Sequence, residues 1–544
     1  MKRRIHKLLF FFILLTLCSF STGLRAAAYS DEGMIRVGLS YSRGAQLSFN
    51  ALAEEGYELG YFDGDTFVKV GRLSNRYVAF CRDTTLSVHG NTVSATGSGT
   101  VFKPYHLEVA YDFGGKADAE DFIDRVLEAG YEGEIFPAYL RGVWRVRIEH
   151  YSTPEYASAD ADRVRAFTQG ADVTVVGLEE DVITVVDLNS PSLVAELAAP
   201  AGCTPAVRAA GEGNTLKNGQ YYYNGAFEFT RHSSGSLNLV NTVSLADYIK
   251  GVLPYEMDGS WPLEALKAQA LCARSYLLSN MGRHSGFDIC SSTHCQVYYG
   301  TEKETESVRR AVEETMDEVI TYEGKIIGAY FFSSSGGYTE SAKNVWGGNT
   351  APYCAAVPDP FENPDSITHF STTVNRTQLT SLASYLGAGI GQVVDCYVSE
   401  YTEPAHNVYA VTLVGESGKT YTVKGCDNVR IKFSSYVKSP RFDILSGTPL
   451  YADDGQLPRG ELAVVTEDGL DHVEDRFYVI DKNGIERLTR GDSDGTFTFV
   501  GSGFGHNVGM SQYGARGMAE QGYTYREIIH HYFTDVEIMT LDEL

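Results

Sequence analysis

Residues 260–284 carry the most informative pattern in the chain, because they predict a long helix among short strands. Ser260 can cap a helix, and Pro262 suits its first turn. Apolar residues then recur at a spacing of three and four positions: Leu263, Leu266, Ala270, Ala273 and Leu277. We therefore expect one buried face on this helix. Lys267 and Arg274 lie seven positions apart, or two helical turns, so they share a different face.

A shorter helix is expected just before the long one. Ser244 and Asp247 form a capping-box pattern, and Pro254 should stop this helix near Val252. Glu256 would then lie in the tight connection before the long helix, whose dipole favours an ionised carboxylate. If Glu256 acts as an acid, apolar neighbours must outweigh that effect: Leu253, Tyr255, Met257 and Trp261. A capping or ion-paired glutamate is the alternative interpretation.

The rest of the chain consists mainly of short strand patterns. Residues 35–101 alternate apolar and polar side chains between glycines, which is typical of antiparallel strands. We therefore predict an α+β fold. It comprises a strand-rich region at 29–103, a small α+β module at 104–170, connecting strands at 171–203, and a mixed β-rich domain with the long helix at 204–544.

Several elements can be placed more closely. The predicted module has strands at 106–113 and 142–151 and helices at 116–130 and 153–167. In its first helix one face is apolar, and Gly130 should end the helix: Ala119, Phe122, Ile123, Val126 and Leu127. A hairpin is expected within 409–425 and a final helix near 525–532.

The charge balance excludes one class of function. The 544 residues hold 45 basic and 70 acidic side chains, a formal charge of −25. This field repels phosphate backbones, so sequence-independent nucleic-acid binding is not expected. An apolar fraction of 43% supports packed cores rather than disorder. The 35 tyrosines suit sugar surfaces, although most tyrosines in proteins are simply packed.

The first 28 residues read as a secretory signal. Basic residues precede an apolar run of 13 residues, Leu8–Phe20, which is too short for a comfortable membrane span. Ala26 and Ala28 form a small-x-small cleavage pattern. We expect a secreted or extracytoplasmic protein. An uncleaved N-terminal membrane anchor is the alternative.

The stretch Leu245–Tyr276, LADYIKGVLPYEMDGSWPLEALKAQALCARSY, resembles the signature of the SpoIID/LytB family. The resemblance continues at Ser333–Gly348, Ala351–Glu362 and Gly501–Phe533, and so covers about residues 204–544. Four positions depart from the family pattern: Ala246 replaces Glu, Asp258 replaces Pro, Phe332 stands where His is frequent, and Asn507 replaces Gly. None of these departures removes Glu256.

The resemblance implies a peptidoglycan lytic transglycosylase. Such enzymes cleave the β-1,4 bond between N-acetylmuramic acid and N-acetylglucosamine in peptide-stripped glycan strands and leave a 1,6-anhydro end. One carboxyl group suffices, because it protonates the glycosidic oxygen and then accepts the proton of the attacking C6 hydroxyl. By this match Glu256 is the catalytic residue. Lys267 and Arg274 would bind the lactyl carboxylates of the substrate, although a solvated helix face remains the alternative.

The glycine-rich stretch Gly501–Ala515 supplies further candidates. Its glycines allow the backbone to approach substrate closely. We expect substrate contacts from His506, Ser511, Gln512 and Tyr513, and a purely structural turn is the alternative.

Residues 104–170 resemble the SPOR domain, a module that binds peptide-stripped glycan strands. The resemblance rests on Ala119, on Gly130-Tyr131, and on WRVRIEHY at Trp144–Tyr151. The glycine of the family's strand pattern is absent, with Glu149 and His150 around that point. A generic α+β module is the alternative.

Four residues within twelve positions form a complete tetrahedral donor set for Zn²⁺: His284, Cys290, His294 and Cys295. A closed set leaves no position for water, so we expect a structural zinc. The alternative is a Cys290–Cys295 disulfide, which an extracellular setting allows.

Two other functions compete with the transglycosylase hypothesis. A LytB-like protein would bind the wall and enhance an N-acetylmuramoyl-L-alanine amidase without cleaving glycan. A zinc amidase would use the His/Cys cluster, and the closed donor set argues against it. The expected partners are therefore glycan strands and, in the second case, a cell-wall amidase or a sporulation protein.

Overall fold

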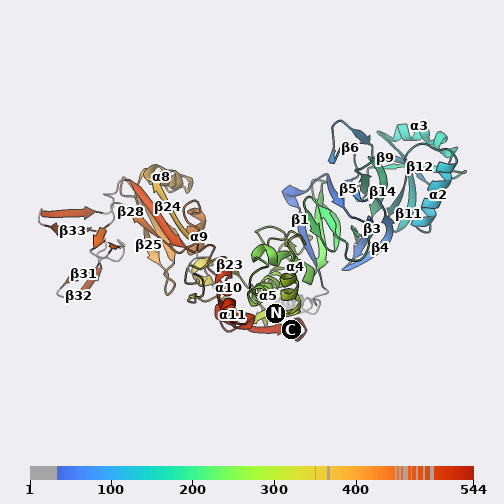
Figure 1. The fold of residues 1–544 in the computed structure, drawn as a ribbon. Coiled ribbons are helices and arrows are strands. Elements are labelled where there is room, and N and C mark those ends of the chain that lie inside the picture. The colour runs from blue at the N-terminus through green and yellow to red at the C-terminus, as the bar shows by residue number, and fades with distance from the viewer. Residues whose placement is uncertain are drawn as a thin grey trace, which may run out of the picture. The chain divides into compact units, whose positions relative to one another are not determined.

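The computed structural model describes residues 33–348, 351–363, 368–446 and 495–544, with the strands of three hairpins between 450 and 489 (Figure 1). The predicted signal at residues 1–28 lies outside the described part. The chain divides into two compact units, Met1–Gly259 with Asn280–Asp317, and Ser260–Ser279 with Glu318–Leu544. Strands and helices are mixed in both, which confirms the predicted α+β class. In the described ranges, no helix is long and apolar enough to cross a membrane.

A seven-stranded sheet of the first unit carries the start of the signature stretch. Its order is β20-β1-β19-β18-β15-β3-β4. The strands are β1 (Met34–Ser40), β3 (Tyr57–Asp63), β4 (Thr66–Leu73), β15 (Thr204–Ala209), β18 (Ala226–Arg231), β19 (Leu237–Ser244) and β20 (Ile289–Cys290). All neighbours are antiparallel except β1 and β20. Strands from residues 34–73 and 204–290 thus form one sheet, because hydrogen bonding across β1 and β19 joins them.

A ten-stranded sheet forms the rest of this unit, in the order β12-β9-β11-β10-β14-β13-β5-β2-β16-β17. Its strands are β2 (Ser48–Leu52), β5 (Tyr77–Arg82), β9 (Tyr105–Val109), β10 (Ile135–Leu140), β11 (Val143–Tyr151), β12 (Val173–Gly177), β13 (Ile183–Asp187), β14 (Ser192–Ala198), β16 (Leu216–Asn218) and β17 (Tyr221–Tyr223). A small sheet of β6 (Leu86–His89), β7 (Thr92–Ser94) and β8 (Thr100–Phe102) accompanies it.

The helices predicted within residues 104–170 are present. They are α2 (Lys116–Glu128) and α3 (Pro154–Arg165), and both pack on the ten-stranded sheet. Four residues of the predicted α2 face are buried, Ala119, Phe122, Ile123 and Val126, whereas Leu127 is 43% exposed. Gly130 follows the helix end with a φ of +89°, as a terminating glycine should. Strand β10 was not predicted, and it joins this segment to β14.

The second unit is assembled around helix α5 (Leu263–Asn280), which the sequence predicted. Most of α5 is buried, and Leu263 of the predicted stripe is half-buried. Buried residues beyond the stripe are Ala265, Ala268, Gln269, Leu271, Cys272, Arg274, Ser275 and Asn280. Shorter elements of this unit are α7 (Ala342–Trp346), α10 (Gln512–Glu520), α11 (Tyr525–Tyr532), β21 (Glu318–Tyr322), β22 (Lys325–Ile326), β23 (Phe331–Phe332), β36 (Met510–Ser511) and β37 (Glu537–Thr540). The predicted final helix is therefore confirmed as α11.

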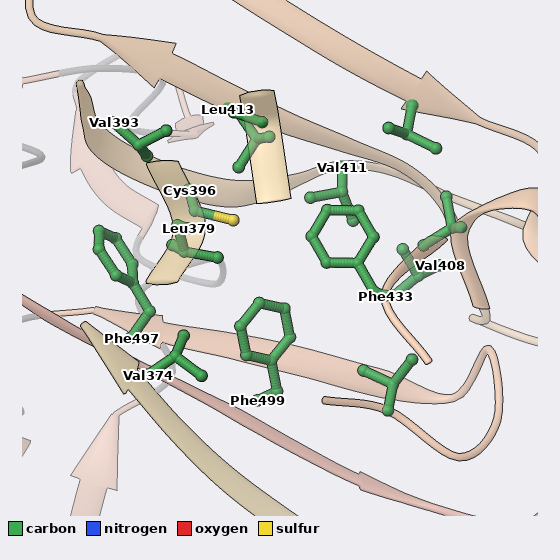
Figure 2. Close-up of a cluster of buried hydrophobic side chains, with 14 of the residues drawn as sticks. Val374, Leu379, Val393, Cys396, Val408, Val411, Leu413, Phe433, Phe497 and Phe499 are labelled. Carbon is green, nitrogen blue, oxygen red and sulfur yellow. The ribbon is translucent and has the colours of Figure 1, made fainter. Parts of the chain in front are cut away.

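A smaller module with its own core is inserted into the second unit. It contains the sheets β24-β35-β28 and β25-β26-β27. Its elements are β24 (His369–Asn375), α8 (Arg376–Tyr385), β25 (Val393–Tyr401), β26 (Val408–Gly415), β27 (Thr420–Lys424), α9 (Cys426–Lys432), β28 (Phe442–Ser446) and β35 (Thr496–Ser502). Figure 2 shows its core, where Phe433, Phe497 and Phe499 lie among aliphatic side chains. The β26–β27 pair is the predicted hairpin.

Three two-stranded hairpins lie between β28 and β35. They are β29 (Leu450–Ala452) with β30 (Gly455–Leu457), β31 (Ala463–Thr466) with β32 (Gly469–His472), and β33 (Arg476–Asp481) with β34 (Gly484–Thr489).

Candidate functional site

Glu256 is the last residue of helix α4 (Leu245–Glu256) and is half-buried. The Ser244 side chain accepts a hydrogen bond from the Asp247 N–H, which confirms the predicted N-cap. The prediction that Pro254 stops the helix was wrong, because α4 continues through it. Glu256 therefore ends the short helix rather than lying in a connection before the long one.

Pro254 is tolerated because it lies in the last turn of α4. A proline there loses a single backbone hydrogen bond, and the turn closes after it. The Met257 N–H donates to the Leu253 carbonyl at 2.9 Å. Both Pro254 and Met257 are buried, so packing holds the helix end in place.

Packing explains two residues of the signature, Tyr248 and Gly251. A Cβ at Gly251 would lie 2.5 Å from the Tyr298 ring, so only glycine fits there. The Tyr248 hydroxyl donates to Gln296 at 3.0 Å, and the Tyr298 hydroxyl donates to Asn241 at 2.7 Å. These buried bonds fix α4 to β19 and to the chain that follows β20.

Three half-buried tyrosines gather near Glu256 in the first unit. The Tyr221 and Tyr299 rings stack with centroids 4.6 Å apart, and the Tyr255 ring meets Tyr299 edge-on at 5.1 Å. The Lys303 Nζ lies 4.6 Å from the Tyr255 centroid. Tyrosine faces and a cation next to a carboxyl group suit binding of a sugar chain. The sequence pattern indicated Tyr255 only as an apolar neighbour of Glu256, and the other members of this group were not predicted.

Lys267 and Arg274 lie in the second unit, on α5. The Lys267 Nζ lies 2.7 Å from Glu264 and 5.5 Å from the Tyr525 ring centroid. Arg274 is fully buried, and its Nη1 donates to the Glu318 carbonyl at 3.0 Å. The alternative of a solvated helix face is therefore wrong for Arg274. In this conformation Arg274 holds the start of β21.

An aromatic and cationic cluster forms where the signature stretch meets the C-terminal motif. The rings of Trp261 and Tyr513 lie 5.1 Å apart, and the Arg516 guanidinium lies 5.1 Å from the Trp261 centroid. All three side chains are partly accessible. Tyr513 was predicted, whereas Trp261 and Arg516 were missed as contact residues. The neighbouring Gln512, also predicted, is 8% exposed as the first residue of α10.

A buried carboxylate joins the three C-terminal motifs. Glu362 accepts hydrogen bonds from Ser334 Oγ at 3.1 Å, Ser335 N at 2.5 Å, Gly336 N at 3.0 Å and Ser511 Oγ at 2.7 Å. Ser511 Oγ also caps α10 by accepting from the Gly514 N–H. The structure thus places Ser511 in an internal network, and the sequence analysis did not assign Glu362 a role.

Asp359 lies in the same interior. Its carboxylate accepts from the Tyr532 hydroxyl at 2.9 Å, and both residues are buried. Burial and the charge of Glu362 raise the pKa of Asp359 to about 6. Two acidic groups removed from water explain this direction. Glu362 is thus a carboxylate that accepts four hydrogen bonds, and Asp359 is a neighbouring carboxyl group whose protonated form is favoured.

His506 lies between aromatic rings. Its ring centroid is 5.6 Å from Phe332 and 5.3 Å from Trp346. Its Nδ1 accepts a hydrogen bond from the Val508 N–H at 3.0 Å. Burial lowers the pKa of His506 to about 4, so the imidazole is neutral at pH 7. This environment suits a packed histidine more than a group that carries a proton to substrate.

The four predicted metal ligands come together in the first unit. Their donor atoms all lie within 4.8 Å of one another. His284 Nε2 is 3.2 Å from Cys295 Sγ, and His294 Nδ1 is 3.3 Å from Cys295 Sγ and 3.6 Å from Cys290 Sγ. Donors bound to a tetrahedral zinc lie about 3.3–3.8 Å apart. The donor set and its spacing therefore fit Zn²⁺.

Cys290 and Cys295 are free thiols, as are the other six cysteines of the described chain. Burial would raise the pKa of Cys290, but hydrogen bonds from Ser292 and Tyr41 outweigh it and lower the value to about 6. Tyr41 follows β1, and Cys290 lies on β20 beside it. The cluster thus connects the N-terminal strand to the segment after α5.

Comparison with known proteins agrees with these motifs. Residues 233–322, from just before β19 to the end of β21, match the family model SpoIID, described as stage II sporulation protein. The chain is 31% identical over 333 residues to an uncharacterized protein of Brachyspira hyodysenteriae, covering 60% of this chain and 74% of that protein.

Two Bacillus subtilis (strain 168) proteins are also similar. The identity is 30% over 298 residues with the amidase enhancer, covering 52% of this chain and 39% of the enhancer. It is 27% over 323 residues with stage II sporulation protein D, covering 56% of this chain and 76% of that protein.

Proposed function

Because the chain belongs to the SpoIID family, we propose that it is a peptidoglycan lytic transglycosylase acting on peptide-stripped glycan strands outside the cytoplasm. The bond cleaved joins N-acetylmuramic acid to N-acetylglucosamine. The muramyl C6 hydroxyl attacks C1 of the same sugar, the C1–O4 bond breaks, and a 1,6-anhydro ring forms. The proton lost by the C6 hydroxyl balances the proton given to the leaving oxygen.

The position of Glu256 is the observation that carries this proposal. The carboxyl group ends α4, where the last carbonyls present the negative end of the helix dipole. In the proposed reaction a general acid at this position must carry a proton before the glycosidic bond breaks. Half-burial leaves the group accessible, and the tyrosines around Tyr255 offer faces for sugar rings. Glu256 then serves as acid toward the leaving oxygen and as base toward the C6 hydroxyl.

The other predicted site residues take different roles in this proposal. Lys267 and Tyr513 are accessible enough to contact the glycan strand. Arg274 and Ser511 are positioning residues, because they are buried and hold backbone and Glu362. His506 supports the same motif through its contacts with Phe332 and Trp346.

Cleavage of a defined substrate tests the proposal. Peptide-free glycan strands incubated with the protein should yield 1,6-anhydro ends, detected by mass spectrometry, and Glu256→Gln should abolish them. Glu302→Gln is the matched control, because Glu302 is an exposed carboxylate whose charge acts on Tyr255. It should retain normal activity. A folded wild-type protein that forms no anhydro product would rule the activity out.

The similarity to the amidase enhancer supports a second candidate function. In that case the protein binds the wall and stimulates an N-acetylmuramoyl-L-alanine amidase without cutting glycan. The Glu256→Gln variant separates the two functions. It should still stimulate an amidase if the protein is an enhancer, whereas it should lose all wall-directed activity if the protein is only a transglycosylase.

We also propose that residues 104–170 form a SPOR-like glycan-binding module. The strand pattern of that family has a glycine near Glu149. Here Glu149 adopts a φ of +56°, at a register shift between Ile148 and Tyr151. A left-handed residue at the position of a glycine supports a shared backbone conformation. Pull-down of residues 104–170 fused to a carrier on peptide-stripped glycan strands tests this assignment.

A structural zinc at His284, Cys290, His294 and Cys295 is the remaining proposal. Zinc would join Cys290 on strand β20 to His284 before this strand and to His294 and Cys295 after it. It would supply no chemistry to the reaction. Elemental analysis should find about one zinc per chain in wild type and none in Cys290→Ser. Cys203→Ser, at a half-buried cysteine outside the cluster, should retain it. A Cys290–Cys295 disulfide found in non-reduced peptides would contradict the zinc site.

A further inference from the structure

A cavity of about 630 Å³ opens on the inserted module, apart from the residues discussed above. It lies where β24, β28 and β35 meet the end of β25. Six of its lining residues carry its chemistry: His369, Phe370, Tyr401, His406, Arg441 and Asp443. Aromatic surface and convergent polar groups in one concave site are the usual marks of a ligand site.

One wall of the cavity is a flat aromatic surface. The Tyr401 and His406 rings stack with centroids 4.2 Å apart and an interplanar angle of 4°. His406 is exposed and has a φ of +54°, an uncommon conformation for a residue other than glycine. Its backbone N–H donates to the Thr402 carbonyl at 2.9 Å, so the loop is fixed. An uncommon backbone conformation at a residue whose ring lines the cavity indicates a functional role for the His406 ring.

The second feature of the pocket is the guanidinium group of Arg441. Arg441 is half-buried, and its Nη1 donates to the Ala405 carbonyl at 2.7 Å. Among the residues that the structure describes, no carboxylate lies within ion-pair distance of Arg441. Asp443 instead accepts from the Tyr401 hydroxyl. A guanidinium placed in this way can take a carboxylate through two parallel hydrogen bonds.

The cavity also borders the central motif network. Its floor includes Gly501 and Ser502, the last residues of β35. The Ser502 N–H donates to the Arg441 carbonyl at 3.1 Å, and a Cβ at Gly336 would collide with Ser502. Gly336 is one of the donors to Glu362. The pocket is therefore fixed to the rigid interior of the second unit rather than to a loose surface loop.

We propose that this pocket binds a sugar ring that bears a carboxylate, as a subsite for a glycan strand. The Tyr401–His406 face would contact the C–H surface of the ring, and Arg441 would pair with its carboxylate. Asp443 and the Tyr401 oxygen, whose proton is donated to Asp443, would accept hydrogen bonds from hydroxyl groups of the sugar. Identification of that sugar as muramic acid rests on the proposed function, whereas the preference for an acidic sugar rests on the pocket alone.

Calorimetry on the whole chain carrying Glu256→Gln tests the subsite, because this background should prevent turnover. The probes are a peptide-free GlcNAc–MurNAc tetrasaccharide, neutral chitotetraose and inorganic phosphate. Arg441→Gln should weaken the acidic tetrasaccharide about tenfold or more and leave chitotetraose unchanged, since one bidentate ion pair is lost. His406→Asn keeps a residue that tolerates positive φ, and it should weaken both sugars. Lys419→Gln, an exposed charge removal in the same module, should change neither.

Two results would overturn the subsite. One is tetrasaccharide binding that neither Arg441→Gln nor His406→Asn alters in folded protein. The other is phosphate binding that Arg441→Gln weakens while sugar binding is unaffected, which would mark a simple anion site. Cleavage by the chain with an intact Glu256 is measured separately. If the chain with an intact Glu256 does not cleave glycan but the pocket still binds the tetrasaccharide, only the transglycosylase proposal fails. If cleavage is normal but Arg441→Gln and His406→Asn leave binding unchanged, only the subsite proposal fails.

Discussion

Two glutamates of the family-like motifs, Glu256 and Glu362, differ in their burial. Glu256 is half-buried at the end of a helix. Glu362 is 5% exposed and accepts four hydrogen bonds from two serine hydroxyls and two backbone N–H groups. A carboxylate that organises so many donors fixes the chain, because removal of it would leave each donor unsatisfied. Membership of a motif therefore does not identify a reacting group, and the proposed function assigns that role to Glu256 because its side chain is half-buried rather than buried.

The hydrogen bonds to Glu362 also explain why three segments of the family-like motifs lie together. The segments Ser333–Gly348, Ala351–Glu362 and Gly501–Ala515 converge on Glu362. This convergence holds Tyr513 against Trp261 at the surface. The interior of the second unit thus supports the half-buried residues Trp261 and Tyr513.

The largest expected difference between the two glutamates is in stability. Glu362→Gln replaces an acceptor with an amide N–H that faces existing donors, and it should destabilise the fold by about 3 kcal/mol. Glu256→Gln should cost less, about 1 kcal/mol of the free energy of unfolding, because Glu256 is half-buried rather than buried. Thermal melting of both variants checks this contrast, with a Tm loss of about 6 °C or more for Glu362→Gln alone. Equal melting temperatures would remove the distinction between a supporting and a reacting glutamate.

A smaller effect should appear in the pH dependence of stability. Burial raises the pKa of Asp359 to about 6, above its unfolded value, so ionisation weakens the folded state as pH rises from 4 to 6. Burial lowers the pKa of His506 to about 4, so the folded state gains stability as pH rises from 4 to 6.5. The two contributions oppose each other, each by up to about 3 kcal/mol.

Single variants should separate these opposing slopes. Asp359→Asn should make the Tm rise more steeply between pH 4 and 6, and His506→Gln should make it fall relative to wild type. Melting curves at half-unit pH steps measure both, and Glu302→Gln provides a control with a wild-type profile. Identical profiles for all variants would show that neither Asp359 nor His506 titrates in this range.

The local sequence pattern was sufficient to predict the helices but not the pairing of strands that are distant in the chain. Apolar spacing predicted α2, α5 and α11 because a helix is set by residues three and four apart. The pairing of β1 with β19 was not predictable, since it joins residues about two hundred positions apart in the chain. Pro254 was misread because its cost depends on whether the helix continues for another turn.

The candidate site shows the same limit. Spacing found the four residues of the His/Cys cluster, which lie close in the chain. It predicted Arg274 as a substrate-binding residue, with a solvated helix face as the alternative, although Arg274 is fully buried and donates to the Glu318 carbonyl. Glu362 stood within a quoted motif, but its role depends on donors from Ser334 and Ser511, far away in sequence. Residue type and spacing identify candidates, and only the packing of distant segments assigns their roles.

The smallest effect concerns Asn507, which stands where the family pattern has glycine. Its φ is +64°, its Nδ2 donates to the Ser335 carbonyl at 3.1 Å, and its carbonyl accepts from the Glu340 N–H. Asn507→Ala loses the side-chain bond and strains the left-handed backbone, at a cost of about 2 kcal/mol. Asn507→Gly relieves the strain and loses only the bond, so it should cost about half as much. Chemical denaturation of the two variants measures the difference. Equal losses would mean that the Ser335 bond alone explains asparagine here, whereas a larger loss for alanine would mean that the turn around Glu362 requires the left-handed conformation itself.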